Sequence, residues 1–171
     1  METETHMAIG SSAPVPAVLS IRQVKIPVTD LRRSVEWYTS LLGLKLLRKF
    51  VEDGELAGAV LSHPAGFVIS VRLRSLVPGA PSFAGFDLFS LGVASRDELD
   101  LLLSRAIELG AAHGEIVDRG IDGLHLDIAD PDGTLVRFLT PAAVDGAGFV
   151  GVSFDGSGVP TFYSNPLLKP A

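Results

Sequence analysis

The chain has 171 residues, with 14 Lys and Arg against 20 Asp and Glu for a formal charge of −6, and 47% of its residues are hydrophobic. This composition is too apolar for a disordered chain and too polar for a membrane protein, and the acidic balance argues against a nucleic-acid partner. No cysteine is present, which excludes disulfides, thiolate metal sites and cysteine nucleophiles.

Residues 1–19 are predicted to form a flexible tail. They lack the cationic start and the apolar core of a signal peptide, and the stretch SSAPVPAVLS is small and Pro-bearing. No apolar run in the chain approaches the roughly 20 residues that cross a bilayer. We therefore expect a cytoplasmic protein without a membrane partner.

The first structured unit covers about 21–76. Alternating apolar residues predict a strand at 24–28, and Asp30 and Gly43 bracket a predicted helix at 31–42. Three further strands are expected at 45–51, 56–62 and 67–74, since turn residues separate them.

The second unit covers about 85–141 and repeats this order after a Pro- and Gly-rich connector at 75–85. A strand is expected at 86–93, and Ser95 with Glu98 forms the pattern of a capping box before an apolar helical stripe that ends at Gly110. Strands are then expected at 115–118, 124–128 and 135–140.

The two units also share a sequence echo, because PAGFVISVRL (64–73) aligns with PDGTLVRFLT (131–140). Together they predict an α+β domain over 20–141. In it, two βαβββ modules pack side by side into a curved mixed sheet, with helices on the outer face.

Residues 142–171 form a C-terminal extension that is rich in Gly and almost free of charge. Segments 149–154 and 159–163 fit the two strands of a hairpin. Four aromatic residues favour a strap over the domain or over a partner subunit, with a disordered tail as the alternative.

The segments VKIPVTDLRRSVEWYTSLLGLKLL (24–47) and GLHLDIADPDGTLVRFLTP (123–141), with the capped second helix, resemble the vicinal oxygen chelate superfamily. That superfamily includes glyoxalase I, extradiol dioxygenases, fosfomycin-resistance enzymes and bleomycin-resistance proteins. The resemblance covers about 21–141 and implies the fold. It does not imply one particular reaction, because proteins with this fold carry out several chemistries.

Metal-containing members of that family carry four inward-facing ligands, usually His or Gln, Glu, His and Glu. The resemblance places these positions on Gln23, Ser70, Leu88 and Arg137. Leu88 offers no lone pair, and Arg137 offers only donors and stays charged. A guanidinium about 4 Å from a dication is repelled by about 8 kcal/mol at an effective dielectric near 20. We therefore expect neither a metal nor another cofactor.

The four histidines give no alternative ligand cluster, because none pairs with another at a short spacing. His125 alternates with apolar residues near Asp127. The two residues are either an acid–base pair in the cavity or part of an exposed strand face with a cross-strand hydrogen bond. No catalytic residue is assigned.

Strand alternation places Lys25 beside Gln23, and Arg72 beside Ser70, on the concave face that Arg137 shares. Leu88, Leu135 and Leu139 are expected to be its apolar walls. A buried guanidinium needs an anionic partner, so Arg137 pairs either with a ligand or with a carboxylate such as Glu52, Glu55 or Asp127.

These observations lead to a metal-free protein that binds a small organic anion or natural product, similar to the bleomycin-resistance branch. The expected ligand-binding residues are Gln23, Lys25, Ser70, Arg72, Leu88 and Arg137. The resemblance also implies a homodimer with pockets shared between subunits. The alternatives are a glyoxalase- or dioxygenase-like enzyme with a non-standard or metal-free site, and an accessory protein that contacts a partner through 149–163.

Overall fold

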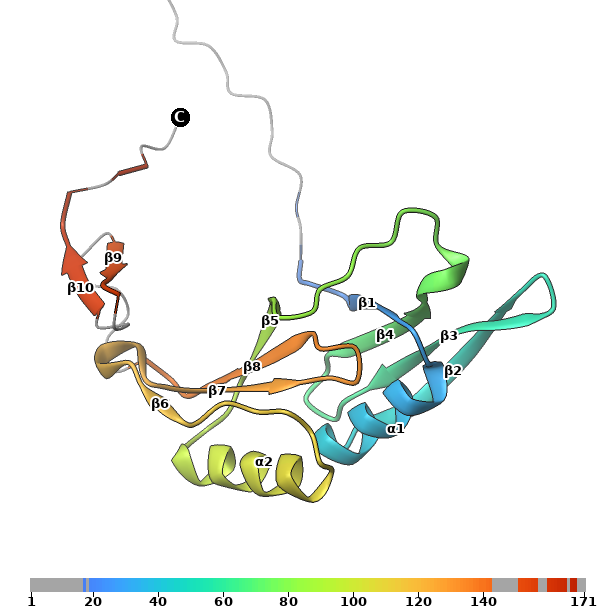
Figure 1. The fold of residues 1–171 in the computed structure, drawn as a ribbon, viewed down its shortest axis with the longest axis horizontal. Helices are drawn as coiled ribbons and strands as arrows, with labels where there is room; N and C mark the ends of the chain where they lie inside the picture. The colour runs from blue at the N-terminus through green and yellow to red at the C-terminus, as the bar shows by residue number, and fades with distance from the viewer. Residues whose placement is uncertain (1–16, 18, 143–150, 157–159, 166, 169–171) are drawn as a thin grey trace, which may run out of the picture.

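The computed structural model describes residues 17, 19–142, 151–156, 160–165 and 167–168 (Figure 1). The expected N-terminal tail at 1–19 therefore lies almost entirely outside the described residues. Within them, two α/β modules follow one another along the chain, and a short hairpin follows the second.

The first module is a four-stranded sheet covered by one helix. Its strands follow the order β1-β4-β3-β2, with β1 parallel to β4 and the other neighbours antiparallel. The elements are β1 (Val24–Val28), α1 (Leu31–Leu42), β2 (Lys45–Glu52), β3 (Glu55–Ser62) and β4 (Val68–Leu73).

The two ends of helix α1 are defined by its capping residues, Asp30 and Gly43. The Asp30 side chain accepts a hydrogen bond from the Arg33 backbone N–H, which satisfies one free donor of the first turn. Gly43 takes the left-handed conformation at φ 66° and returns its N–H to the Thr39 carbonyl. The predicted boundaries at 31–42 are confirmed.

The second module repeats this architecture after the short helix η1 (Arg74–Leu76) and a connector. Its sheet order is β5-β8-β7-β6, with β5 parallel to β8. The elements are β5 (Asp87–Gly92), α2 (Arg96–Glu108), β6 (Val117–Asp118), η2 (Gly120–Asp122), β7 (Leu124–Ala129) and β8 (Leu135–Leu139).

Two details of this module differ from the expectations. Ser95 is the N-cap residue of α2, but its side chain makes no capping hydrogen bond, so the predicted capping box is wrong. The strand expected at 115–118 shortens to β6, because residues 111–116 bridge to β7 only through the isolated pair His113 and Ile128.

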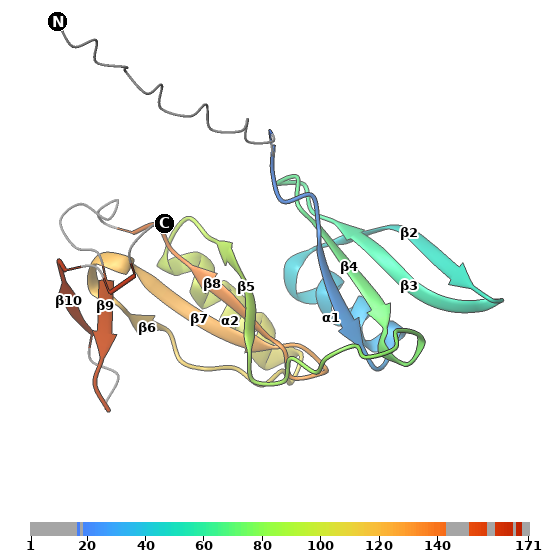
Figure 2. The same ribbon diagram turned by 90° about the horizontal axis from the view of Figure 1, so that it is seen from above.

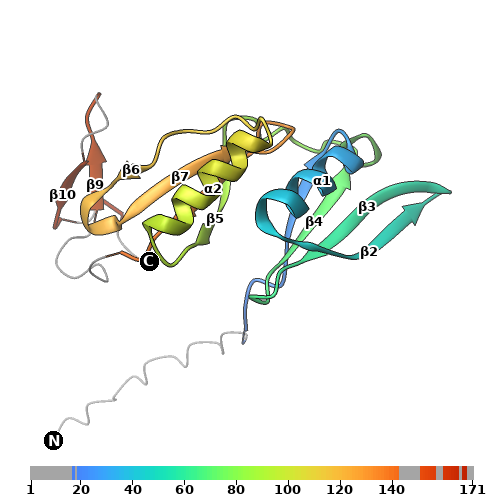
Figure 3. The same cartoon turned by 90° about the horizontal axis from the view of Figure 1, so that it is seen from below.

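The modules lie side by side, with β1 and β5 as the facing edges of two separate sheets (Figure 2). Seen from below, α1 and α2 cover the same side of their respective sheets (Figure 3). One hydrophobic core contains buried side chains from both modules, including Tyr38 and Leu41 of the first and Leu99 and Phe138 of the second. The α+β fold with two βαβββ modules is confirmed, but the modules form two four-stranded mixed sheets instead of the single curved sheet that we predicted.

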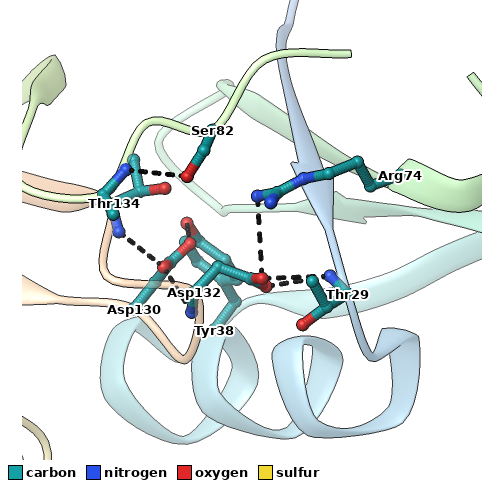
Figure 4. A network of polar contacts seen from close by, with 8 residues as sticks. Thr29, Tyr38, Arg74, Ser82, Asp130, Asp132 and Thr134 are labelled. Atoms are coloured by element: carbon teal, nitrogen blue, oxygen red, sulfur yellow. Dashed lines mark hydrogen bonds and ion pairs between the residues drawn. The ribbon is translucent and has the colours of Figure 1, made fainter. Parts of the chain in front are cut away.

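A polar network joins the modules at the turn between β7 and β8 (Figure 4). The buried Tyr38 hydroxyl donates to Asp130 Oδ2 at 3.0 Å, and Asp130 Oδ1 also accepts from the backbone N–H groups of Asp132 and Thr134. Asp132 in turn accepts from the Thr29 backbone N–H and lies 3.7 Å from Arg74. The turn of the second module is thereby held against α1 and β1 of the first.

The C-terminal extension forms the predicted hairpin. Strands β9 (Gly151–Phe154) and β10 (Pro160–Tyr163) pair antiparallel, whereas 149–150 and 157–159 of the predicted hairpin lie outside the described residues. Phe154 contacts the second module, because the Arg119 guanidinium lies 5.0 Å from its ring centroid. Among the described residues, neither helix has the length and apolarity of a membrane span.

Candidate functional site

Each sheet has one face without a helix, which we term its open face. In the first module Ile26, Val28 and Val71 point toward α1, so their strand neighbours Lys25, Pro27 and Arg72 point to the opposite side. In the second module Val136 and Phe138 point into the core, and Arg137 lies on the open face between them.

The first open face is ordered into rows by the strand register. One row crosses all four strands through Lys25, Ser70, Val60 and Arg48. The next row contains Pro27, Arg72, Gly58 and Phe50. Gly58 leaves room for the Phe50 ring and the Val71 carbonyl, since a Cβ at this position would lie 2.2 Å from the ring and 2.6 Å from the backbone oxygen of Val71.

Gln23 and Ser70 meet on this face as predicted. Ser70 is 2% exposed, and its hydroxyl donates to Gln23 Oε1 at 3.2 Å. The amide oxygen is thus engaged by the hydroxyl. The amide N–H₂ of Gln23 is the remaining hydrogen-bond donor of this pair.

The two cations of this face differ in their partners. Arg72 forms an ion pair with Glu52 at 2.6 Å and lies 5.9 Å from the Phe50 ring centroid. Its Nε is buried and has no hydrogen-bond partner among the described residues. Lys25 is exposed and, in the part of the chain that the structure describes, makes no ion pair.

Lys25 and Arg72 line a hollow of about 440 Å³ between the sheet and the connector that follows it. In Figure 1 this connector arches over β1 and β4. The remaining walls are mainly apolar and come from Pro27, Leu76, Val77, Pro78, Ala80, Pro81 and Phe83.

The second open face contains a closed charge network around Arg137. Its Nε and Nη2 donate to the two oxygens of Asp127 at 2.8 Å each, and its Nη1 lies 2.5 Å from Asp87 Oδ2. These hydrogen bonds lower the pKa of Asp127, although partial burial acts in the opposite direction. Of the three expected internal partners, Asp127 is thus found, whereas Glu52 pairs with Arg72 instead.

Asp87 is a site residue that the sequence analysis did not identify. A β-bulge between Asp87 and Phe89 shifts the alternation of β5, which brings Asp87 beside Arg137. Leu88 is half-buried and packs against the hydrophobic core. The prediction of Leu88 as an apolar wall of the concave face is therefore corrected. Asp87, the residue next to it in sequence, contacts Arg137 instead.

His125 does not match the exposed-face alternative. It is 8% exposed instead of lying on an exposed face, and its Nδ1 accepts a hydrogen bond from Arg119 Nε at 3.2 Å. Burial lowers the pKa of His125 below its ordinary value of 6.5, and the positive charge of Arg119 lowers it further. With Arg119 donating to Nδ1, the neutral imidazole carries its N–H on Nε2.

The four positions that carry metal ligands in related proteins do not fit a divalent ion here. Leu88 has no donor atom, Arg137 brings a cation that two carboxylates already neutralise, and the Ser70 hydroxyl is bonded to Gln23. Among the described residues, no group of three or more His, Asp or Glu side chains is arranged to hold a metal ion.

The structure divides the predicted site residues into two groups. Gln23, Lys25, Ser70 and Arg72 lie together on the first sheet. Leu88 and Arg137 lie on the second sheet, which does not share hydrogen bonds with the first. The hollow at Lys25 includes no residue of the second group.

Comparisons with known proteins give a consistent picture. A family model described as the Glyoxalase/Bleomycin resistance protein/Dioxygenase superfamily matches residues 20–138. The chain is 27% identical over 113 residues to the catechol-2,3-dioxygenase of Bacillus subtilis (strain 168), which is 66% of this chain. The match spans only 38% of that relative's length.

Two solved structures show the same fold. One is a glyoxylase/bleomycin resistance protein/dioxygenase domain from Frankia sp. EAN1pec, with a TM-score of 0.63 and 23% identity over 76% of this chain and 97% of that one. The other is TnmS3, an antibiotic-binding protein from Streptomyces sp. CB03234, with a TM-score of 0.59 and 19% identity over 74% of this chain and 98% of that one.

Proposed function

The chain belongs to the glyoxalase/bleomycin resistance protein/dioxygenase superfamily, and from that premise we propose that it is a metal-free member that binds a small organic anion or natural product. Binding, rather than transformation, is favoured by the residues at the ligand positions. A leucine and a neutralised guanidinium cannot supply the lone pairs that metal-assisted chemistry requires.

One observation carries this proposal: Lys25 lines an apolar-walled hollow of about 440 Å³ without an ion-pair partner among the described residues. This volume is in the range of ordinary ligand pockets, whose walls are mostly apolar with a few polar groups that orient the ligand. Arg72, with its unpartnered Nε, adds a second positive group beside Lys25. A carboxylate or phosphate on an aromatic body fits this combination.

The other predicted residues take different roles in this proposal. Gln23 and Ser70 form a hydrogen-bonded floor next to Lys25. Arg137 forms ion pairs with Asp87 and Asp127. Its charge is therefore neutralised within the protein, and we give it a structural role on the second open face instead of the role of anion anchor. We assign the anchoring charge to Lys25 instead of Arg137.

A homodimer is part of the proposal. The two groups of site residues lie on separate sheets, so a partner subunit that faces its second module toward the first module would bring them together. Residues of both subunits would then line the ligand-binding site. The cytoplasmic location expected from the sequence also stays with the proposal.

Calorimetry and thermal shift against aromatic carboxylates and aromatic natural-product antibiotics test this function. We expect a ligand that raises the melting temperature without being converted. Lys25→Ala should weaken its binding about fivefold or more, and Lys49→Ala, which removes the same charge from the helix-covered side of β2, should leave it unchanged. Stoichiometric nickel, zinc, iron or manganese in protein purified without chelators would overturn the proposal in favour of the enzyme alternative.

A further inference from the structure

The first open face has a second hollow that the proposed function does not use. It measures about 340 Å³, and its lining includes Arg22, Gln23 and Arg48 as polar residues and Leu47, Val60 and Val68 as apolar ones. Like the hollow at Lys25, it combines cationic side chains with apolar ones, but its lining is more polar.

The strand register connects the two hollows. Lys25 of the first hollow and Arg48 of the second are the ends of one cross-strand row, with Ser70 and Val60 between them. Three strand spacings of about 4.8 Å separate the ends, so their Cα atoms are about 14 Å apart. Between the two positive ends the row contains Ser70, which is buried and bonded to Gln23, and Val60, which lines the second hollow.

The positive ends are not neutralised by the protein where the structure describes it. Of the first module's carboxylates, Glu52 is the one paired on this face, and its partner is Arg72. Asp30 caps α1, Glu36 lies on α1, and Asp53 and Glu55 lie at the tip of the β2–β3 hairpin. Arg22, Lys25 and Arg48 make no ion pair within the described residues, so each is available to an anion.

We propose that the ligand is an elongated dianion that lies across the strands of the first sheet, with one acidic group at Lys25 and the other at Arg48 and Arg22. Its apolar body lies over Val60 and over Gln23, whose amide oxygen is bonded to the buried Ser70 hydroxyl. This inference rests on the proposed function and narrows it from an anion of any shape to one with two separated charges.

Two probes that differ by one carboxylate separate this inference from the proposed function: para-biphenyl carboxylate and para,para-biphenyl dicarboxylate. We expect the dicarboxylate to bind the full-length chain about fivefold more tightly, because it gains a second charged contact. Its affinity should also fall more steeply as salt is added.

Variants assign each end of the ligand. Arg48→Gln should remove the advantage of the dicarboxylate and leave the monocarboxylate unchanged, whereas Lys25→Ala should weaken both probes. Arg32→Gln removes an arginine from the first turn of α1, on the other side of the sheet, and should change neither. Circular dichroism and melting temperature confirm that each variant is folded.

The outcomes distinguish the two ideas. Equal affinities for the two probes, with Lys25→Ala weakening both, would overturn the dianion inference and leave the proposed function standing. An unchanged dicarboxylate advantage in Arg48→Gln would overturn the assignment of the second end. Failure of both probes to bind would contradict both ideas. A change of sedimentation in Arg48→Gln without a change in probe binding would assign the row to an acidic protein surface instead.

Discussion

Arg137 joins three strands of the second sheet through one guanidinium, because Asp87 lies on β5, Asp127 on β7 and Arg137 on β8. Arg137→Ala leaves two half-buried carboxylates facing each other, and we expect it to lower the free energy of unfolding by about 2 kcal/mol. Urea denaturation measures this loss. The matched control is Arg96→Ala, whose side chain is 61% exposed in a pair with Asp100; it should cost less than about 0.5 kcal/mol. Equal losses would mean that the network is no stronger than a surface pair.

His125 gives the protein a specific response to acid. Burial and Arg119 lower its pKa in the folded protein. As the pH falls below the ordinary value of 6.5, the histidine is therefore protonated in the unfolded chain before it is protonated in the folded protein. The free energy of unfolding should therefore fall as the pH drops below about 6.5 and should level off once the folded histidine is protonated. Asp127, whose pKa is also lowered, adds a second loss as the pH falls below its ordinary 3.8.

His125→Gln isolates the first of these effects. The fall in stability between about pH 7 and pH 5, measured by urea denaturation, should be smaller in this variant than in the wild type. His113→Gln, which changes an exposed histidine, should retain the wild-type slope. A wild-type slope in both variants would place the responsible group elsewhere.

At the scale of elements, the contact between α1 and the β7–β8 turn fixes how the two modules sit together. Tyr38→Phe removes the hydroxyl that donates to Asp130, a buried carboxylate whose pKa is raised by its burial. We expect the free energy of unfolding to fall by about 1–2 kcal/mol, since a buried acceptor loses one of its partners.

Ser34→Ala is the control for this prediction on the same helix. The Ser34 hydroxyl is buried and has no partner among the described residues, so its removal eliminates an unpaired polar group and improves helix propensity. Urea denaturation should show unchanged or increased stability. A comparable loss in both variants would show that the helix tolerates no change at this interface and that the Tyr38 hydrogen bond is not special.

The elements themselves were largely predictable because their signals are local. Asp30 and Gly43 specify the ends of α1 by short-range hydrogen bonding and backbone conformation. The capping box at Ser95 failed although its pattern is present, since the pattern does not determine whether the serine side chain turns toward the helix. Alternation along β1 and β4 also placed Lys25 and Arg72 on one face correctly.

The site could be predicted only in part, because its partners depend on register. The resemblance assigned Leu88 to the open face, but the bulge in β5 places Asp87 beside Arg137 instead. The position of this bulge depends on the pairing of β5 with β8, and β8 lies far from β5 in the sequence. The residues of β5 alone therefore do not predict the bulge. The partner of Arg137 could not be predicted from local sequence either, because the register of β7 and β8 is what places Asp127 opposite Arg137.

At the scale of the whole molecule, charge is divided between the modules. Residues 20–76 contain nine Lys and Arg against five Asp and Glu, whereas 85–141 contain four against eleven. The first module is thus positive and the second negative, although the chain as a whole is acidic. In the proposed homodimer this division favours a head-to-tail arrangement, in which the first module of one protomer meets the second module of its partner.

The division of charge predicts that dimerisation weakens with salt. Attraction between opposite modules acts over about 10 Å at 0.1 M ionic strength and over about 3 Å at 1 M, so added sodium chloride should shift the sedimenting species from dimer toward monomer. A dimer held together by apolar burial would instead become more stable in sodium sulfate, because this salt strengthens apolar association.

Sedimentation velocity at one protein concentration, in sodium chloride and in sodium sulfate, separates these two cases. A dimer that persists unchanged in about 1 M sodium chloride would contradict the electrostatic arrangement.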